Sequence, residues 1–403
     1  MKWFGWALLS LMAASPAWAA RKISVEQLKD LLVSLQQAKK TDAEVASELM
    51  QVELTEQLTR STLNRVAPGV PGPLSSVQIY VLEIRSAVFL PPASDLPSAP
   101  APDAATQRGI LDKAIDYATT TYAQLPHLTA IKTTYRFEEK WPDIDSPTIT
   151  AGVGALSAEF DLDKRQLGQV IHFSKSTEIP VDLEQGAERD QVPADKTHWG
   201  ENGQIALRGK EPDLAEVLKE ARAAGKIDWL RWEKVNGVQT AVYAFAVGKK
   251  ETHYTVDYCC FRNERMTSMG LIGSSALSEH SASSDTSDWV SRKITVPYHG
   301  EIFVDPETGI VVRLVNQAEF KPSEDIRQED RRIDFERVTV GAKTLVLPVR
   351  EMISAVTINK KTISQTSAVR ISSSELFTKT CNTLFTAEYK GYQLAGGTSP
   401  APK

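Results

Sequence analysis

The sequence predicts an α+β protein, in which an N-terminal helical segment is followed by a large antiparallel β-sheet that curves into a half-barrel with helix cover. Apolar residues recur at helical spacing as far as Pro126 and alternate beyond it, with turn signals at hairpin spacing. The chain is 42% hydrophobic and 24% charged, which is typical of globular proteins. A chain of this composition can bury a substantial core.

The first residues have the pattern of a secretory signal peptide. Lys2 precedes an apolar run over residues 3–14, and small residues flank Trp18 at Ala17 and Ala19. The run is shorter than the roughly 20 residues of a spanning helix. We therefore expect residues 1–19 to be removed, leaving a periplasmic or secreted chain without a transmembrane segment.

A helical module is expected over residues 20–67. Two capping boxes, at residues 24–27 and 41–44, precede apolar residues at helical spacing, and Thr55 is expected to cap a third helix. The Pro- and Gly-rich residues 68–73 then form a linker, because proline cannot continue a helix.

Residues 74–125 are expected to contain two helices separated by a Pro- and Ala-rich connector over residues 90–105. The first helix is predicted over residues 74–89. The second has an apolar face that ends near Tyr122 and is the natural cover for one face of the sheet.

The half-barrel domain is expected over residues 126–392, because hairpin signals recur there. The sharpest signal is Asn236-Gly237, which suits a type I′ turn, and Asp305 to Gly309 marks a second hairpin. Gly341-Ala342 and Asn359-Lys360 are expected to mark two more.

Two further segments complete the prediction. Residues 212–224 are predicted to form a short helix. Residues 393–403 are predicted to be a disordered tail, because they lack apolar periodicity.

The sequence resembles an uncharacterised family of exported bacterial proteins, and it carries this resemblance in residues 54–58, 228–233, 253–260 and 298–306. That family implies no catalytic residue. A more distant similarity, to the periplasmic lipoprotein-sorting fold, rests on the Asp305 to Gly309 hairpin and on residues 333–348. It implies a half-barrel with helices as a lid over an apolar cavity.

Charge and motifs argue against several classes of partner. The formal net charge is −5, and removal of Lys2 with the signal peptide makes it −6. No basic run is long enough to follow a phosphate backbone, so no nucleic-acid partner is expected. No Gly-rich phosphate motif is present, and we expect no cofactor.

The candidate ligand-binding residues are aromatic. Trp229, Trp232, Tyr254 and Tyr258 place much aromatic area on neighbouring strands. They would line an apolar pocket if helices cover them. The alternative is ordinary core packing.

Three cysteines allow one disulfide in an exported protein. Cys259 and Cys260 face opposite ways on a strand, so only one of them can lie beside Cys381, and Cys260 is the predicted partner. A strained bridge between Cys259 and Cys260, or three free thiols, are the alternatives.

The function predicted from these features is that of an exported, non-enzymatic binding protein. Its half-barrel would hold an apolar ligand, such as a lipid or acyl chain, or dock an envelope protein. One alternative is a structural or interaction module of the envelope. Another is an exported hydrolase that uses His299 and Glu301, which project from the same face of a strand. No metal site is predicted.

Overall fold

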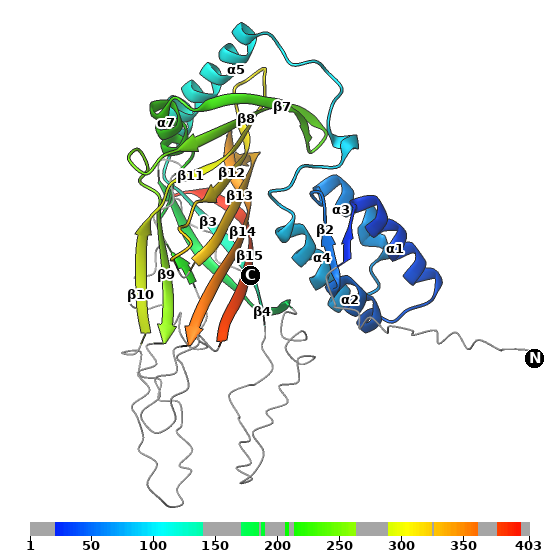
Figure 1. Cartoon of the computed structure of the whole chain (residues 1–403). Coiled ribbons are helices and arrows are strands. Elements are labelled where there is room, and N and C mark those ends of the chain that lie inside the picture. Colours follow the sequence, from blue (N-terminus) through cyan, green and yellow to red (C-terminus); the bar gives the residue numbers. More distant parts are fainter. Residues whose placement is uncertain are drawn as a thin grey trace, which may run out of the picture.

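The structure is a computed structural model. It describes residues 21–139, 171–184, 187–189, 206–208, 213–262, 289–324, 326–361 and 377–395. The predicted signal peptide lies outside these ranges. The chain is α+β, with several helices and a large antiparallel sheet (Figure 1). None of the helices in these ranges is long and apolar enough to cross a membrane.

The helical module begins as predicted. Both capping boxes are present, with Ser24 capping α1 and Thr41 capping α2. The elements of this region are β1 (Arg21–Ile23), α1 (Val25–Gln37), α2 (Asp42–Met50), β2 (Val52–Leu54), α3 (Arg60–Val66), η1 (Ala67–Gly69) and α4 (Pro73–Arg85).

The start of the third helix was predicted wrongly. Thr59 caps α3, and Thr55 does not, because residues 52–54 form β2 in a parallel pair with β1. The backbone N–H of Thr55 donates to the carbonyl of Ile23 at 3.0 Å, which extends this pairing. The predicted linker is also partly helical, since Ala67–Gly69 is a 3₁₀ turn and Pro73 is the first residue of α4.

Two helical segments cover the large sheet at the top of Figure 1. The first is α5 (Ala104–Asp116), which continues as the π-turn η3 (Tyr117–Thr121) and the 3₁₀ turn η4 (Tyr122–Gln124). The second is α7 (Leu214–Ala224), which has a capping box at Asp213 and ends at Gly225 in the left-handed region. A short turn, η2 (Ala93–Asp95), interrupts the connector before α5.

The main sheet has ten strands in the order β5-β4-β3-β15-β14-β13-β12-β11-β8-β7, and every pairing in it is antiparallel. A smaller sheet has the order β10-β9-β6. The strands are β3 (Leu128–Glu139), β4 (Ile171–Glu184), β5 (Ala187–Arg189), β6 (Ala206–Arg208), β7 (Ile227–Val235), β8 (Val238–Val247), β9 (Thr255–Arg262), β10 (Trp289–Thr295), β11 (Tyr298–Val304), β12 (Val311–Ala318), β13 (Ile326–Val340), β14 (Lys343–Lys361) and β15 (Phe377–Leu394).

Three of the predicted hairpins are confirmed. Asn236 and Gly237 have φ of 51° and 83°, as a type I′ turn requires, and join β7 to β8. The Asp305 to Gly309 turn joins β11 to β12, and Gly341-Ala342 joins β13 to β14.

The predicted turn at Asn359-Lys360 is wrong. Both residues lie inside β14, where they pair with Lys379 and Thr378 of β15. The local turn propensity of asparagine is overridden by this long pairing. At the other end, β15 reaches Leu394, so ordered strand extends into the segment predicted as a disordered tail.

The main sheet has two differently covered faces. We call the face that carries α5 and α7 the inner face and the opposite face the outer face. Next to the helices, the inner face is apolar, and its core combines residues such as Ala114, Leu218, Ile302, Leu314 and Leu347. The smaller sheet contributes to the same core through Val256.

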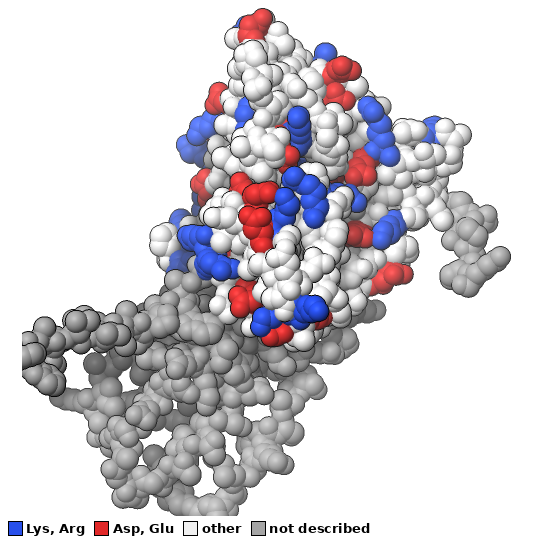
Figure 2. Space-filling view, turned by 90° about the vertical axis from the view of Figure 1, so that its right-hand side faces the viewer, with Lys and Arg blue, Asp and Glu red and all other residues white. Residues whose placement is uncertain are grey.

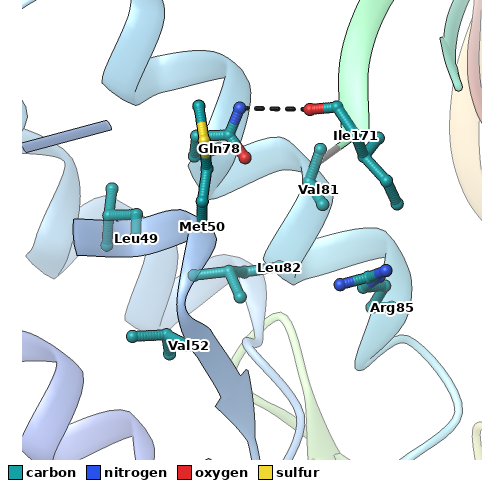
Figure 3. A pocket seen from close by; sticks show the side chains of 8 residues that line it. All are labelled: Leu49, Met50, Val52, Gln78, Val81, Leu82, Arg85 and Ile171. Atoms are coloured by element: carbon teal, nitrogen blue, oxygen red, sulfur yellow. Dashed lines mark hydrogen bonds between the residues drawn. The ribbon is translucent and has the colours of Figure 1, made fainter. Parts of the chain in front are cut away.

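Helix α4 connects the helical module to the outer face. Its Ile79 and Leu82 belong to the core of the module, whereas Val81 and Ile84 pack on the sheet against Phe137 and other residues. Its residues also line a cavity of about 10 Å³ between the module and β4, at the lower limit for a single water molecule (Figure 3). The Nε2 of Gln78 donates to the carbonyl of Ile171 across it at 3.3 Å.

An ion pair reinforces this contact. The carboxylate of Glu83 on α4 accepts two hydrogen bonds from the guanidinium of Arg350 on β14, at 2.6 and 2.8 Å. Both side chains are largely buried, and the bidentate geometry fixes the helix on the strand. Figure 2 shows positive and negative side chains interspersed on the face of the molecule that carries the module.

Candidate functional site

The two predicted tryptophans lie together but contact other parts of the chain. The rings of Trp229 and Trp232 are 4.8 Å apart, and Trp229 also packs on Tyr243 at 5.6 Å. The indole N–H of Trp232 donates to the backbone carbonyl of Pro100 at 2.9 Å. The hydroxyl of Tyr243 donates to the backbone carbonyl of Gln107 at 2.6 Å. These aromatics therefore anchor the connector and α5 to the sheet.

Tyr254 belongs to a different aromatic group. It is completely buried, its ring lies 5.3 Å from Tyr298, and Tyr298 lies 5.7 Å from Phe245. The hydroxyl of Tyr254 donates to Oε1 of Glu329 at 2.9 Å. The structure thus separates Tyr254 from the two tryptophans.

The other predicted residues are described only by their backbone. The side chains of Tyr258, Cys260 and Cys381 lie outside the part of the chain whose side chains the structure describes. Cys260 lies on β9 of the smaller sheet and Cys381 on β15 of the main sheet. The predicted disulfide stays a prediction.

Sequence reasoning missed a set of charged residues on the inner face, beyond the apolar core. We call Lys132, Glu188, Arg331, Glu351 and Tyr389 the ionic layer. The Nζ of Lys132 lies 2.9 Å from Glu188 and 3.3 Å from Glu351, and Nε of Arg331 lies 2.5 Å from Glu351. The hydroxyl of Tyr389 lies 2.7 Å from Glu188 and 3.0 Å from Glu351.

Each member of the ionic layer comes from a different strand of the main sheet. The clue in the sequence is that β13 carries charged residues at consecutive positions from Glu329 to Arg332, so that charge falls on both faces of the strand. Which other strands neutralise it depends on the strand order, and local sequence does not encode that order.

The electrostatics of the ionic layer favour the charged forms of Glu351 and Lys132. Burial alone would raise the pKa of Glu351, but Arg331 and Lys132 outweigh burial and hold that pKa at about 2. Burial would lower the pKa of Lys132, yet the two neighbouring glutamates raise it instead. Glu351 and Lys132 are consequently charged at neutral pH, although the side chain of Glu351 is almost fully withdrawn from water.

Glu329 differs from the carboxylates of the ionic layer. It is 1% exposed, and its Oε2 has no hydrogen-bond partner among the residues that the structure describes. Burial, reinforced by the charges of Asp330 and Glu351, raises its pKa to about 7, although the hydrogen bond from Tyr254 acts in the opposite direction. An unused carboxyl oxygen in this position can bind a donor or release a proton near neutral pH.

The pair proposed for a hydrolase does not form a joint site. His299 contacts Glu319 through Nδ1 at 3.0 Å, whereas Glu301 forms two hydrogen bonds with Arg231, at 2.9 and 2.8 Å. Across the described ranges, no group of three or more His, Cys, Asp or Glu residues is arranged to hold a metal ion.

Apolar side chains adjoin the ionic layer on the inner face. Ile353 is paired with Arg331, and Phe385 is paired with Ile353, so all three project to the same side; both apolar residues are half-buried. Ile179 is paired with Lys132 and is 38% exposed.

Comparison with known proteins gives no match to a family model, to a curated protein or to a solved structure.

Proposed function

We propose that the protein is an exported, non-enzymatic binding protein whose main sheet curves into a half-barrel and holds a lipid or acyl chain against its inner face. The observation that carries the proposal is the ionic layer, together with the unused oxygen of Glu329, on the face that α5 and α7 cover only in part. The proposal takes the ligand to lie beyond the packed apolar core.

Charges in this position are a weak source of folding stability. Withdrawing an ion pair from water costs free energy that the pair only partly recovers, and apolar residues often replace such pairs without loss of stability. Buried ionisable groups with shifted pKa values are concentrated at functional sites. The ionic layer therefore favours a role in binding over a role in stability.

The surroundings of the layer suggest an amphipathic ligand. Lys132 and Glu188 are 17% and 22% exposed, so solvent reaches them. The exposed Ile179 and the half-buried Ile353 and Phe385 adjoin them on the same face. An acyl chain could cover these apolar groups while its polar end contacts the charged ones.

A matched pair of isoleucines tests this. Ile179 and Ile131 are 38% and 37% exposed and lie on paired strands, but Ile179 projects from the inner face and Ile131 from the outer face. A fatty-acid-like probe should bind the folded protein saturably and raise its unfolding temperature. Ile179→Glu should weaken that binding at least about tenfold, because it places a negative charge beside the chain, whereas Ile131→Glu should not.

Three results would contradict the proposal. The first is the absence of saturable binding by folded protein stripped of endogenous lipid. The second is equal weakening by both variants, which would indicate adsorption to apolar surface in general. The third is probe binding without a rise in unfolding temperature, which would point to partly unfolded protein.

A further inference from the structure

A larger cavity lies where the helical module meets the β7–β8 hairpin. Its volume is about 140 Å³. It is lined by the start of α3, by the turn η2, by the hairpin and by one residue of β12, namely Thr59, Arg60, Ser61, Asp95, Lys234, Val235, Asn236, Gly237 and Arg313. Each of these four segments contributes at least one charged side chain, and the start of α3 also contributes two hydroxyl groups.

The charged side chains that line this cavity directly are predominantly positive. Arg60, Lys234 and Arg313 contribute three positive charges, against one negative charge from Asp95. Lys234 is exposed and forms no ion pair with any residue in the described ranges. The structure thus brings three cations from distant parts of the sequence to one small space.

Two of these cations have partners, which differ in strength. Arg313 is buried and is held by Asp334 at 2.7 Å, with Glu233 at 3.8 Å. Arg60 forms only a solvent-exposed contact with Glu336 at 3.4 Å, and such pairs contribute little. Arg60 and Lys234 are therefore the cations that remain available to a ligand.

Hydroxyl groups complete the lining. The hydroxyl of Thr59 donates to the carboxylate of Asp95 at 2.9 Å, and the hydroxyl of Ser61 lies 3.0 Å from that of Thr59. Because Thr59 gives its one hydroxyl proton to Asp95, Ser61 is the donor to Thr59, so these two hydroxyls hold Asp95 in place and leave the cations to bind a ligand.

We propose that this cavity binds a small oxyanion, a phosphate, sulfate or short carboxylate group, held between Arg60 on the module and Lys234 on the hairpin. Guanidinium and ammonium groups bind such oxygens through charge-assisted hydrogen bonds. A cavity of about 150 Å³ accepts a molecule the size of benzene, so about 140 Å³ suits one oxyanion group and few further atoms. The site is separate from the inner face of the sheet and does not depend on the lipid proposal.

The test uses the folded mature chain and inorganic phosphate, measured by isothermal titration calorimetry at constant ionic strength. Binding with one-to-one stoichiometry is expected. Lys234→Met and Arg60→Met, which keep the aliphatic stem and remove the charge, should each raise the Kd at least about tenfold, the effect of losing one charged hydrogen bond. Lys343→Met, at another exposed lysine that lies beside the β13–β14 turn and outside the cavity, should leave the Kd unchanged.

A second arm identifies the source of the oxyanion. Sedimentation with phosphatidylglycerol vesicles, reduced by Lys234→Met and not by Lys343→Met, would assign the site to a lipid headgroup, whereas calorimetric binding of phosphate would assign it to a free anion. Either result supports an oxyanion site. The proposal is overturned if neither phosphate nor vesicles bind, or if binding is the same in Lys234→Met, Arg60→Met and Lys343→Met proteins of unchanged circular dichroism.

Discussion

The buried carboxyl of Glu329 should make the stability of the fold depend on pH. Its pKa in the folded protein is about 7, against an ordinary value of 4.5. Between these two values the folded chain keeps a proton that the unfolded chain has lost, so the free energy of unfolding falls as pH rises. The stabilisation is complete below pH 4.5 and is lost as the pH passes 7.

The size of the effect follows from the shift. A difference of about 2.5 pKa units, at about 1.4 kcal/mol per unit, corresponds to about 3 kcal/mol. Glu329→Gln keeps an oxygen that can accept from Tyr254 but cannot ionise. The unfolded chain has already lost part of this proton at pH 5, so between pH 5 and pH 8 we expect the wild type to lose about 2.5 kcal/mol relative to this variant, whatever the two stabilities are at pH 5.

Urea unfolding of both proteins at pH 5, 6, 7 and 8 measures this difference. Glu336→Gln, at an exposed position of the same strand, is the matched control and should follow the wild type. If the Glu329→Gln curve runs parallel to the wild-type curve over this range, Glu329 does not hold its proton in the folded state and the electrostatic argument for the inner face fails.

Three further predictions concern the rest of the chain. Glu83→Ala should destabilise the protein by about 3 kcal/mol or more in urea unfolding, because it leaves Arg350 buried without its partner. Replacing both residues by methionine should recover part of this loss. A loss from Glu83→Ala no larger than that of a surface substitution would refute the account of the contact. Gly237→Val should lower the stability by roughly 1 kcal/mol or more, since valine resists positive φ, and an unchanged thermal transition would contradict the turn geometry. N-terminal sequencing of protein recovered from the envelope or medium should return Ala20, and recovery of Met1 from a membrane fraction would refute export.

Local signals in the sequence were sufficient for several elements. The capping boxes at Ser24 and Thr41 and the turn at Asn236-Gly237 each depend on neighbouring residues alone, and the structure has all three. Helix α5 was likewise predictable as the sheet cover, because its apolar face is continuous in sequence.

Features that depend on distant parts of the chain were not predictable. Val52 continues the apolar pattern of α2 in the sequence, but pairing with Arg21 makes it part of a strand. Asn359 has turn propensity, yet it lies within β14 because β15 pairs along its length. The ionic layer could not be predicted from the sequence for the same reason. Lys132 lies on β3 and Glu351 on β14, and the two side chains reach each other across β15, which lies between these strands.

The position of β15 has a consequence for how the chain acquires its structure. Among the residues that the structure describes, this strand comes last in the sequence, but in the sheet it lies between β3 and β14. Strands β4 and β5 lie beyond β3, and strands β13, β12, β11, β8 and β7 lie beyond β14. The two parts of the sheet have no shared edge until it is inserted. Synthesis therefore has to reach residue 394 before the sheet can close, and the contacts that close it span most of the sequence. From this topology we expect slow folding with a late step, during which the edges of β3 and β14 stay open to other chains.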